Sequence, residues 1–142
     1  MRRFFYLHNR KKNDLLKKSK QQYPIYHLYL KYIVIDTKIE GNVEIRKGAK
    51  IKNCVLRGPI SIAEDVILEN SYIGPFTSIG ESSVVRNAEI ENSILMGSCN
   101  VHDLERRLDS CLIGWNAEVT GKDSHPKADS MYLGDDSKVL IA

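Results

Sequence analysis

The chain has 142 residues, 42% of them hydrophobic and 27% charged, with a formal net charge of +3. This length and balance are typical of one soluble globular domain. No apolar run is as long as a membrane span, the start of the chain is not an export signal, and the three cysteines lack metal-finger spacing. We therefore expect a cytoplasmic protein without a disulfide framework, and we exclude a membrane-spanning protein.

Residues 1–35 are predicted to form a basic N-terminal segment. Residues 1–33 contain nine lysines and arginines and one acid, Asp14, a charge of +8 that leaves −5 for the rest of the chain. Such an arm could bind nucleic acid or a membrane surface, but no nucleic-acid-reading motif accompanies the charge. We expect a solvated or partner-facing helix here, with no nucleic-acid or membrane partner.

Within this segment, residues 13–22 predict a short helix that Asn13 caps and that ends before Pro24. The next residues, 25–35, are apolar and rich in tyrosine. Tyrosines at every third position favour a helix, whereas Ile33-Val34-Ile35 favours a strand, and both interpretations remain open. In either form we expect these residues to cover the open end of the domain that follows.

Residues 36–142 are predicted to form an all-β domain, because aliphatic residues recur there with a period of about seventeen. Within each period the step is close to six, so three short strands would make one triangular coil. The pattern predicts a parallel β-helix of about five coils, in which each ladder is one inward-facing column. The three ladders are Ile39, Leu56, Ile73, Ile90 and Leu108; Ile45, Ile62, Ile79, Leu95 and Ile113; and Ile51, Leu68, Val85, Val101 and Val119.

An amphipathic helix does not fit this pattern, because a six-residue step moves a side chain off the buried face of a helix but keeps it on one face of a strand. Asparagines 53, 70 and 87 recur with the same period and predict corners. Glycines 74, 80 and 114 each follow a ladder isoleucine, where we expect side chains to obstruct a tight corner. The longer step after Val101 predicts a small protruding loop at residues 102–107.

Several stretches of this β-helix resemble the carboxyl-terminal half of long-form sugar-phosphate nucleotidyltransferases, chiefly glucose-1-phosphate thymidylyltransferase. They are LRGPI (56–60), ENSYIGPFTSIG (69–80), AEIENSI (88–94) and DSCLIG (109–114), and YLGDDSKV (132–139) is similar to that family's closing strand. The resemblance implies a single-stranded, left-handed coil. In that family the coil follows a Rossmann-like catalytic domain.

The start of the chain is similar to the end of that catalytic domain. There the family has a tryptophan-aspartate-threonine-glycine motif whose aspartate holds the catalytic magnesium, and this chain has Leu7-His8-Asn9-Arg10 instead. Imidazole is a poor magnesium ligand, and no glycine-rich triphosphate loop occurs. The resemblance therefore implies the β-helix part of a nucleotidyltransferase without the catalytic domain, a protein that is inactive alone and holds no metal or cofactor.

The same repeat also occurs in acyltransferases, so a second function remains open. Acyl transfer from acetyl-CoA to an amino-sugar phosphate needs a general base, usually histidine. His102 is the one histidine inside the predicted coils, with Asp103 and Glu105 nearby to orient it, and it is our candidate catalytic residue. We expect His125 to be a solvated turn residue. Cofactor-binding residues cannot be named from the sequence.

Phe76 and Trp115 follow ladder isoleucines in what we take to be equivalent stretches, and we expect them on an outer face in a subunit contact. The sequence thus predicts a homo-oligomer formed through the β-helix faces, with a separate nucleotidyltransferase subunit as a second candidate partner. The predicted function is a structural or regulatory oligomerisation module in nucleotide-sugar biosynthesis.

Overall fold

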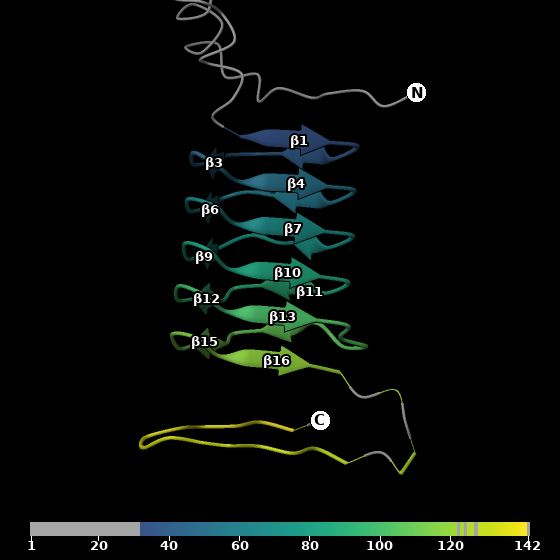
Figure 1. Ribbon diagram of the computed structural model, residues 1–142, viewed down its shortest axis with the longest axis vertical. Coiled ribbons are helices and arrows are strands. Elements are labelled where there is room, and N and C mark those ends of the chain that lie inside the picture. The colour runs from purple at the N-terminus through teal and green to yellow at the C-terminus, as the bar shows by residue number, and fades with distance from the viewer. Residues whose placement is uncertain (1–31, 122, 124, 127, 142) are drawn as a thin grey trace, which may run out of the picture.

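The computed structural model describes residues 32–121, 123, 125–126 and 128–141, and within them the chain forms sixteen short β-strands and no helix (Figure 1). The strands are β1 (Ile33–Ile35), β2 (Lys38–Glu40), β3 (Val43–Ile45), β4 (Lys50–Lys52), β5 (Val55–Arg57), β6 (Ile60–Ile62), β7 (Ile67–Glu69), β8 (Tyr72–Ile73), β9 (Thr77–Ile79), β10 (Val84–Arg86), β11 (Glu89–Glu91), β12 (Ile94–Leu95), β13 (Asn100–His102), β14 (Leu108–Asp109), β15 (Leu112–Ile113) and β16 (Glu118–Thr120).

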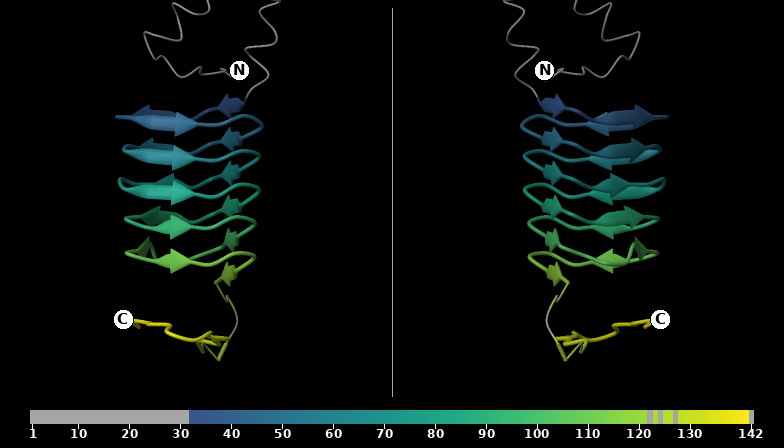
Figure 2. Two further views of the ribbon diagram at one scale, coloured as in Figure 1. Left: turned by 90° about the vertical axis from the view of Figure 1, so that its left-hand side faces the viewer. Right: turned by 90° about the vertical axis from the view of Figure 1, so that its right-hand side faces the viewer.

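Three parallel sheets form the three faces of the solenoid, and each coil contributes one strand to each sheet. Sheet A has the order β1-β4-β7-β10-β13-β16, sheet B β14-β11-β8-β5-β2, and sheet C β15-β12-β9-β6-β3. In Figure 1 the strands of sheet A run to the right in front and the chain returns behind them while it descends, which is a left-handed turn. Figure 2 shows the coils stacked one below another. The predicted left-handed parallel β-helix of about five coils is confirmed.

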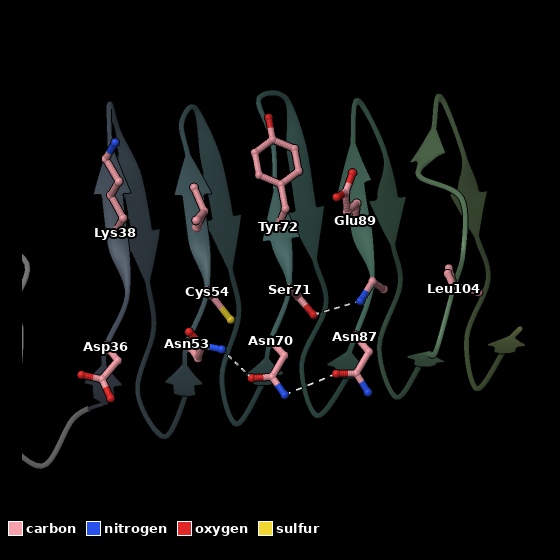
Figure 3. A pocket seen from close by; sticks show the side chains of 12 residues that line it. Asp36, Lys38, Asn53, Cys54, Asn70, Ser71, Tyr72, Asn87, Glu89 and Leu104 are labelled. Carbon is pink, nitrogen blue, oxygen red and sulfur yellow. Dashed lines mark hydrogen bonds between the residues drawn. The ribbon is translucent and has the colours of Figure 1, made fainter. Parts of the chain in front are cut away.

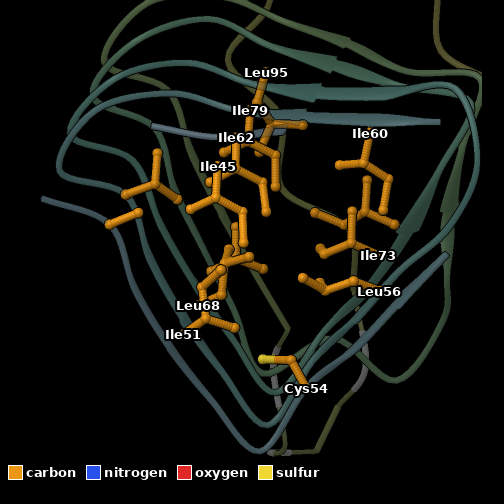
Figure 4. Packing of buried hydrophobic residues seen from close by; sticks show 14 of the residues in the cluster. Ile45, Ile51, Cys54, Leu56, Ile60, Ile62, Leu68, Ile73, Ile79 and Leu95 are labelled. Atoms are coloured by element: carbon orange, nitrogen blue, oxygen red, sulfur yellow. The ribbon is translucent and has the colours of Figure 1, made fainter. Parts of the chain in front are cut away.

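Each predicted ladder is a column of paired residues. The first ladder lies in sheet B, the second in sheet C and the third in sheet A, with every neighbouring pair of each ladder in Cα register. Figure 4 looks along the stack, where the three columns converge in a triangular core. Leu56, Ile62 and Leu68 are fully buried. Burial contributes about 1.5–3 kcal/mol for each such side chain, so these columns are the main source of stability.

The first strand extends the third ladder by one residue. Val34 of β1 pairs with Ile51, so Ile33–Ile35 is a strand and belongs to the solenoid. This decides between the two interpretations of that tripeptide. The predicted helix at residues 13–22, the basic residues up to 31 and the predicted cap at residues 25–31 lie outside the described residues.

The corner between sheets A and B contains a ladder of amides. The Asn53 side-chain amide donates to the Asn70 carbonyl oxygen at 2.8 Å, Asn70 donates to Asn87 at 3.3 Å, and Asn87 donates to Asp103 at 2.7 Å. The three asparagines have φ angles of 51°, 47° and 48°, in the left-handed region that asparagine tolerates better than most residues. The asparagine corners predicted from the sequence are confirmed.

The predicted role of the three glycines holds for two of them. A Cβ atom on Gly74 would lie 2.7 Å from the Glu91 Cβ, and one on Gly80 would lie 2.6 Å from the Met96 carbonyl carbon. Both glycines are therefore required by the coil that stacks on them. Gly114 has no heavy atom within 4 Å of such a Cβ, so the prediction is wrong there. The reason is that no further coil lies against the last one.

The stack departs from its repeat near its C-terminal end, first by a step from Ile90 to Leu95 that is one residue short and then by a longer step from Val101 to Leu108. Val85 pairs with Val101, sixteen positions on, whereas Ile90 pairs with Leu108, eighteen positions on. Residues 103–107 take up the difference as a loop between β13 and β14 (Figure 1). The predicted loop is confirmed, although His102 belongs to the strand before it.

After β16 the chain leaves the stack, and residues 128–141 run below the last coil without forming a strand (Figures 1 and 2). The predicted closing strand at residues 132–139 is therefore not formed. The physical reason is that this segment pairs with no neighbouring strand, and its apolar side chains, such as Tyr132 and Leu140, are exposed.

Candidate functional site

His102 lies on the outer face of sheet A near the C-terminal end of the stack. In β13 the side chains alternate, so Val101 points into the core and His102 points outward. The imidazole Nδ1–H donates to Asp103 Oδ2 at 2.9 Å, and Nε2 lies 3.6 Å from Glu118 Oε1 of β16. The Thr120 hydroxyl lies 3.4 Å from Nδ1. The ring is thus held between a carboxylate of its own corner and a carboxylate of the next coil.

These contacts favour the protonated ring. The hydrogen bond to Asp103, assisted by Glu118, raises the pKa of His102 above its ordinary value. The amide of Asn87 and then the imidazole lower the pKa of Asp103. The structure therefore brings Asp103 to the ring as predicted and adds Glu118, which the sequence reasoning missed. The repeat could have indicated Glu118. Val101 of β13 pairs with Val119 of β16, and the same register places Glu118 beside Asn100, on the outer face that also carries His102.

The space around this histidine is small. A hollow of about 220 Å³ is lined by Arg86, Asn87, Asn100, His102 and Asp103. An imidazole oriented by a carboxylate is the arrangement of a general base. Here, however, the second ring nitrogen also faces a carboxylate, that of Glu118, and not open space. A reacting hydroxyl or amine would have to displace that contact.

A longer, shallow groove follows the corner between sheets A and B (Figure 3). Its volume is about 490 Å³, and its lining includes the asparagine ladder, Cys54 and Ser71. The Ser71 hydroxyl donates to the Glu69 carbonyl and accepts from the Ala88 amide. Burial raises the pKa of the Cys54 thiol to about 11, so the groove offers no thiolate at neutral pH. These polar groups already bond to one another, which leaves little to hold a ligand.

The outer face of sheet B consists of paired charges. Arg57 contacts Glu40 at 2.9 Å, and Arg107 contacts Glu91 at 2.9 Å. Both guanidinium groups also lie over the Tyr72 ring, 5.9 and 4.9 Å from its centroid. Exposed pairs of this kind contribute little to stability individually. They make sheet B a solvated surface with no unbalanced charge cluster for an anion or a metal.

Sheet C has a different outer surface. Its outward ladder changes from polar to apolar along the stack, and Leu112 at its end is 75% exposed. After β3 no charged side chain points outward from the described strands of this sheet. The ladder reads Glu44, Ser61, Ser78, Ile94 and Leu112.

Two exposed aromatic residues border this sheet. Phe76 precedes β9, at the corner with sheet B, and Trp115 follows β15, at the corner with sheet A. The prediction that they occupy equivalent stretches is wrong, because one comes before its sheet C strand and the other after it. The Trp115 ring lies over Gly97 of the preceding coil. We define the sheet C apolar face as Phe76, Ile94, Met96, Leu112 and Trp115.

In residues 32–121 and the described part of the tail, no three His, Cys, Asp or Glu side chains are grouped so that they could hold a metal ion. The described residues also contain no helix that could span a membrane. Leu7-His8-Asn9-Arg10, which the sequence compares with a magnesium-binding motif, lies outside the described residues.

Comparison with known proteins identifies relatives but no matching family model. The chain is 36% identical over 102 residues to a glucose-1-phosphate thymidylyltransferase of Streptomyces griseus, covering 72% of this chain and 28% of that protein. It is 37% identical over 105 residues to the enzyme of that name in Streptomyces antibioticus, covering 74% and 29%. The low-salt glycan biosynthesis nucleotidyltransferase Agl11 of Haloferax volcanii is 32% identical over 72 residues, covering 50% and 20%.

The similarity includes the solenoid. Residues 32–121 make up 90 of the 142 positions, so at most 52 of the 102 aligned residues can lie outside them. The chain spans less than a third of the length of the relatives it matches. The resemblance predicted from the motifs is thereby confirmed: this chain is a β-solenoid homologue of part of the glucose-1-phosphate thymidylyltransferases.

Proposed function

We propose that the solenoid is a structural module that assembles copies of a sugar-nucleotidyltransferase-like protein through sheet C. The observation that supports this is the contrast between the three faces. Charged side chains point outward from most strands of sheets A and B, up to the last ones, β16 and β14, whereas the outward ladder of sheet C is uncharged after β3. The cores of protein interfaces are depleted of charge and enriched in aromatic residues and methionine, as the sheet C apolar face is.

The partner in this proposal is sheet C of a second copy. The apolar residues Ile94 and Leu112 lie at one end of the stack, so rotation about an axis parallel to the stack brings the same end of each copy together. The small side chains of Ser61 and Ser78 leave the other end of the face flat enough for close approach. The charged residue of this ladder, Glu44, lies at the far end and pairs with Arg46 at 3.3 Å, and the uncharged remainder avoids burying unpaired ions.

The names of the relatives support a place in nucleotide-sugar biosynthesis, since they are called glucose-1-phosphate thymidylyltransferases and a glycan nucleotidyltransferase. In this proposal the solenoid contributes assembly and no chemistry, and it needs no cofactor. We place the protein in the cytoplasm, which is supported by the three unpaired cysteines, two of them buried.

The test is the mass of the full chain in solution, measured by light scattering and sedimentation. We expect an oligomer at micromolar concentration, and we expect Leu112→Asp to convert it to a monomer because the change places a charge in the interface. Asn100→Asp is the matched control, since it adds the same carboxylate to an exposed position of sheet A. It should leave the mass unchanged.

A wild-type chain that is monomeric at every concentration contradicts this proposal, as does an oligomer that Leu112→Asp leaves intact. Purification of the protein from its native cell tests the second candidate partner, a separate nucleotidyltransferase subunit. A separate nucleotidyltransferase subunit that binds wild type but not Leu112→Asp would assign the sheet C apolar face to that subunit and not to a second copy.

The second candidate function is acyl transfer with His102 as general base, which the 2.9 Å bond from its imidazole to Asp103 favours. The chain would be incubated with acetyl-CoA and a panel of amino-sugar phosphates, and the acetylated product detected by mass spectrometry. Turnover that His102→Ala abolishes and the distant control His125→Ala preserves would establish this function. Under our main proposal no acetylated product forms.

A further inference from the structure

We infer that residues 131–141 are a sixth partial coil of the solenoid and that they dock on its open C-terminal end. The structure shows this tail separate from the stack (Figures 1 and 2). Its inward aliphatic residues and the backbone of its turn nevertheless match the element that joins sheet C to sheet A in every coil.

The first support is a repeated seven-residue unit. Each unit begins with an inward aliphatic residue of sheet C and ends with an inward aliphatic residue of sheet A, six positions later. The segments 79–85 and 113–119 read Ile-Gly-Glu-Ser-Ser-Val-Val and Ile-Gly-Trp-Asn-Ala-Glu-Val, and residues 133–139 read Leu-Gly-Asp-Asp-Ser-Lys-Val. The tail therefore has the two aliphatic positions of every unit and the glycine of these two units, where the other three units have Arg46, Ala63 and Met96.

The second support is the backbone. The fourth residue of the unit has a left-handed conformation, with φ of 59° at Ser82 and 57° at Asn116. Asp136 of the tail also has φ of 57°, at the end of a two-residue turn, and the Ser137 hydroxyl donates to the Gly134 carbonyl at 2.8 Å. The corner of a sixth coil is thus already formed in the separate tail.

The third support is the surface that would receive it. The core residues of the last coil, Leu108 and Val119, are only partly buried, whereas their counterparts Ile90 and Val101 are fully buried. Strand β16 is the edge of sheet A. The end of a solenoid needs a cover, both to bury its core and to pair its last strand.

Gly114 leaves room for this sixth coil. Its counterpart Gly80 must be glycine because the backbone of the next coil lies 2.6 Å from where a Cβ would be. Nothing lies within 4 Å of the equivalent point at Gly114. The space at Gly114 is therefore open to a further coil, and Gly134 of the tail occupies the matching position of the unit.

Extending the register by one coil produces complementary neighbours. It places Lys138 beside Glu118, Ser137 beside the small Ala117, and Tyr132 beside Leu112. Leu133 and Val139, now 60% and 42% exposed, would extend two columns of the core. Opposite charges and like apolar residues in adjacent strands stabilise a sheet.

The occupant is the chain's own tail and not that of a second copy. From the last core residue of sheet A, Val119, to Leu133 there are 14 positions, and within the stack the equivalent step from Ile51 to Ile62 takes 11. The connection is long enough to cross the face of sheet B and leaves three residues for a loop.

The test joins the tail to the stack by a disulfide in the full chain. Docking would make Thr120 and Leu140 lateral neighbours on the outer face of sheet A, about 4.8 Å apart, which is within disulfide reach. We expect the variant Thr120→Cys/Leu140→Cys to form this bond within one chain under mild oxidation, identified by peptide mapping that separates it from the native cysteines.

Matched variants in that background distinguish docking from chance encounter. Leu133→Asp places a charge in the core and should abolish the bond, whereas Tyr132→Asp, its neighbour, points outward and should preserve it. Far-UV circular dichroism of each variant checks that the stack remains folded.

Three results would overturn this inference. They are a failure of the Thr120→Cys/Leu140→Cys pair to form a bond, equal bond formation in Leu133→Asp and Tyr132→Asp, and a bond that joins two chains. The last would assign the open end to the tail of a second copy. None of these outcomes depends on whether sheet C forms an oligomer.

Discussion

At the scale of single residues, the imidazole of His102 lies between the carboxylates of Asp103 and Glu118. The hydrogen bond to Asp103, with help from Glu118, raises its pKa above the ordinary value of about 6.5. The contribution of the protonated ring to stability is therefore complete below the pKa of the unfolded state and is lost as pH rises through the higher pKa of the folded state. Proton NMR of the ring as a function of pH measures this directly.

Asp103→Asn is the matched variant for this titration, because it keeps the shape of the side chain and removes the charge. We expect the pKa of His102 to fall relative to wild type, and the loss of stability between slightly acid and neutral pH to shrink. An unchanged midpoint in Asp103→Asn would show that the observed contact between the two side chains does not control the titration.

At the scale of elements, the asparagine ladder connects neighbouring coils at one corner. Asn70 both accepts from Asn53 and donates to Asn87, and its backbone is in the left-handed region. Asn70→Ala removes both bonds and leaves a residue that tolerates this backbone poorly. We expect a loss of about 1–3 kcal/mol in the free energy of unfolding, measured with urea.

Asn70→Gly separates the two causes. Glycine adopts the left-handed conformation without strain, so this variant loses only the two hydrogen bonds and should be more stable than Asn70→Ala. If Asn70→Gly is as unstable as Asn70→Ala, backbone strain is not part of the effect. If neither variant is destabilised, the exposed ladder contributes nothing beyond what water provides.

The strands and corners of this fold could be predicted because every coil requires the same types of residue at equivalent positions. Ile39, Leu56 and Ile73 occupy one column, and their spacing alone specifies it. Features that depend on the neighbouring coil could not be predicted in this way. Glu118 reaches His102 only through the register of β13 and β16, and Gly114 lacks the neighbour that Gly80 has.

At the scale of the whole molecule, the proposed function depends on how the three faces of the solenoid differ. This difference can be recognised only from the register of the strands. The hydrophobic spacing locates inward residues but treats all outward ones alike. Only when the strands are assigned to sheets does Leu112 fall in line with Ile94, Ser78 and Ser61, which separates the uncharged face from the two charged ones. The same assignment places Phe76 and Trp115 at opposite borders of that face.

A solenoid in which each coil contacts only its neighbours should open from its ends. Leu68 and Val85 in the middle of sheet A are fully buried, whereas Val119 at its end is only partly buried. We expect the amides of β16 to exchange with deuterium at least roughly tenfold faster than those of β7, measured by NMR or mass spectrometry. In Leu133→Asp the exchange of β16 should become faster still while that of β7 is unchanged, because the variant removes only the covering tail. Equal exchange along the whole stack would instead mean that the coils unfold as a single cooperative unit.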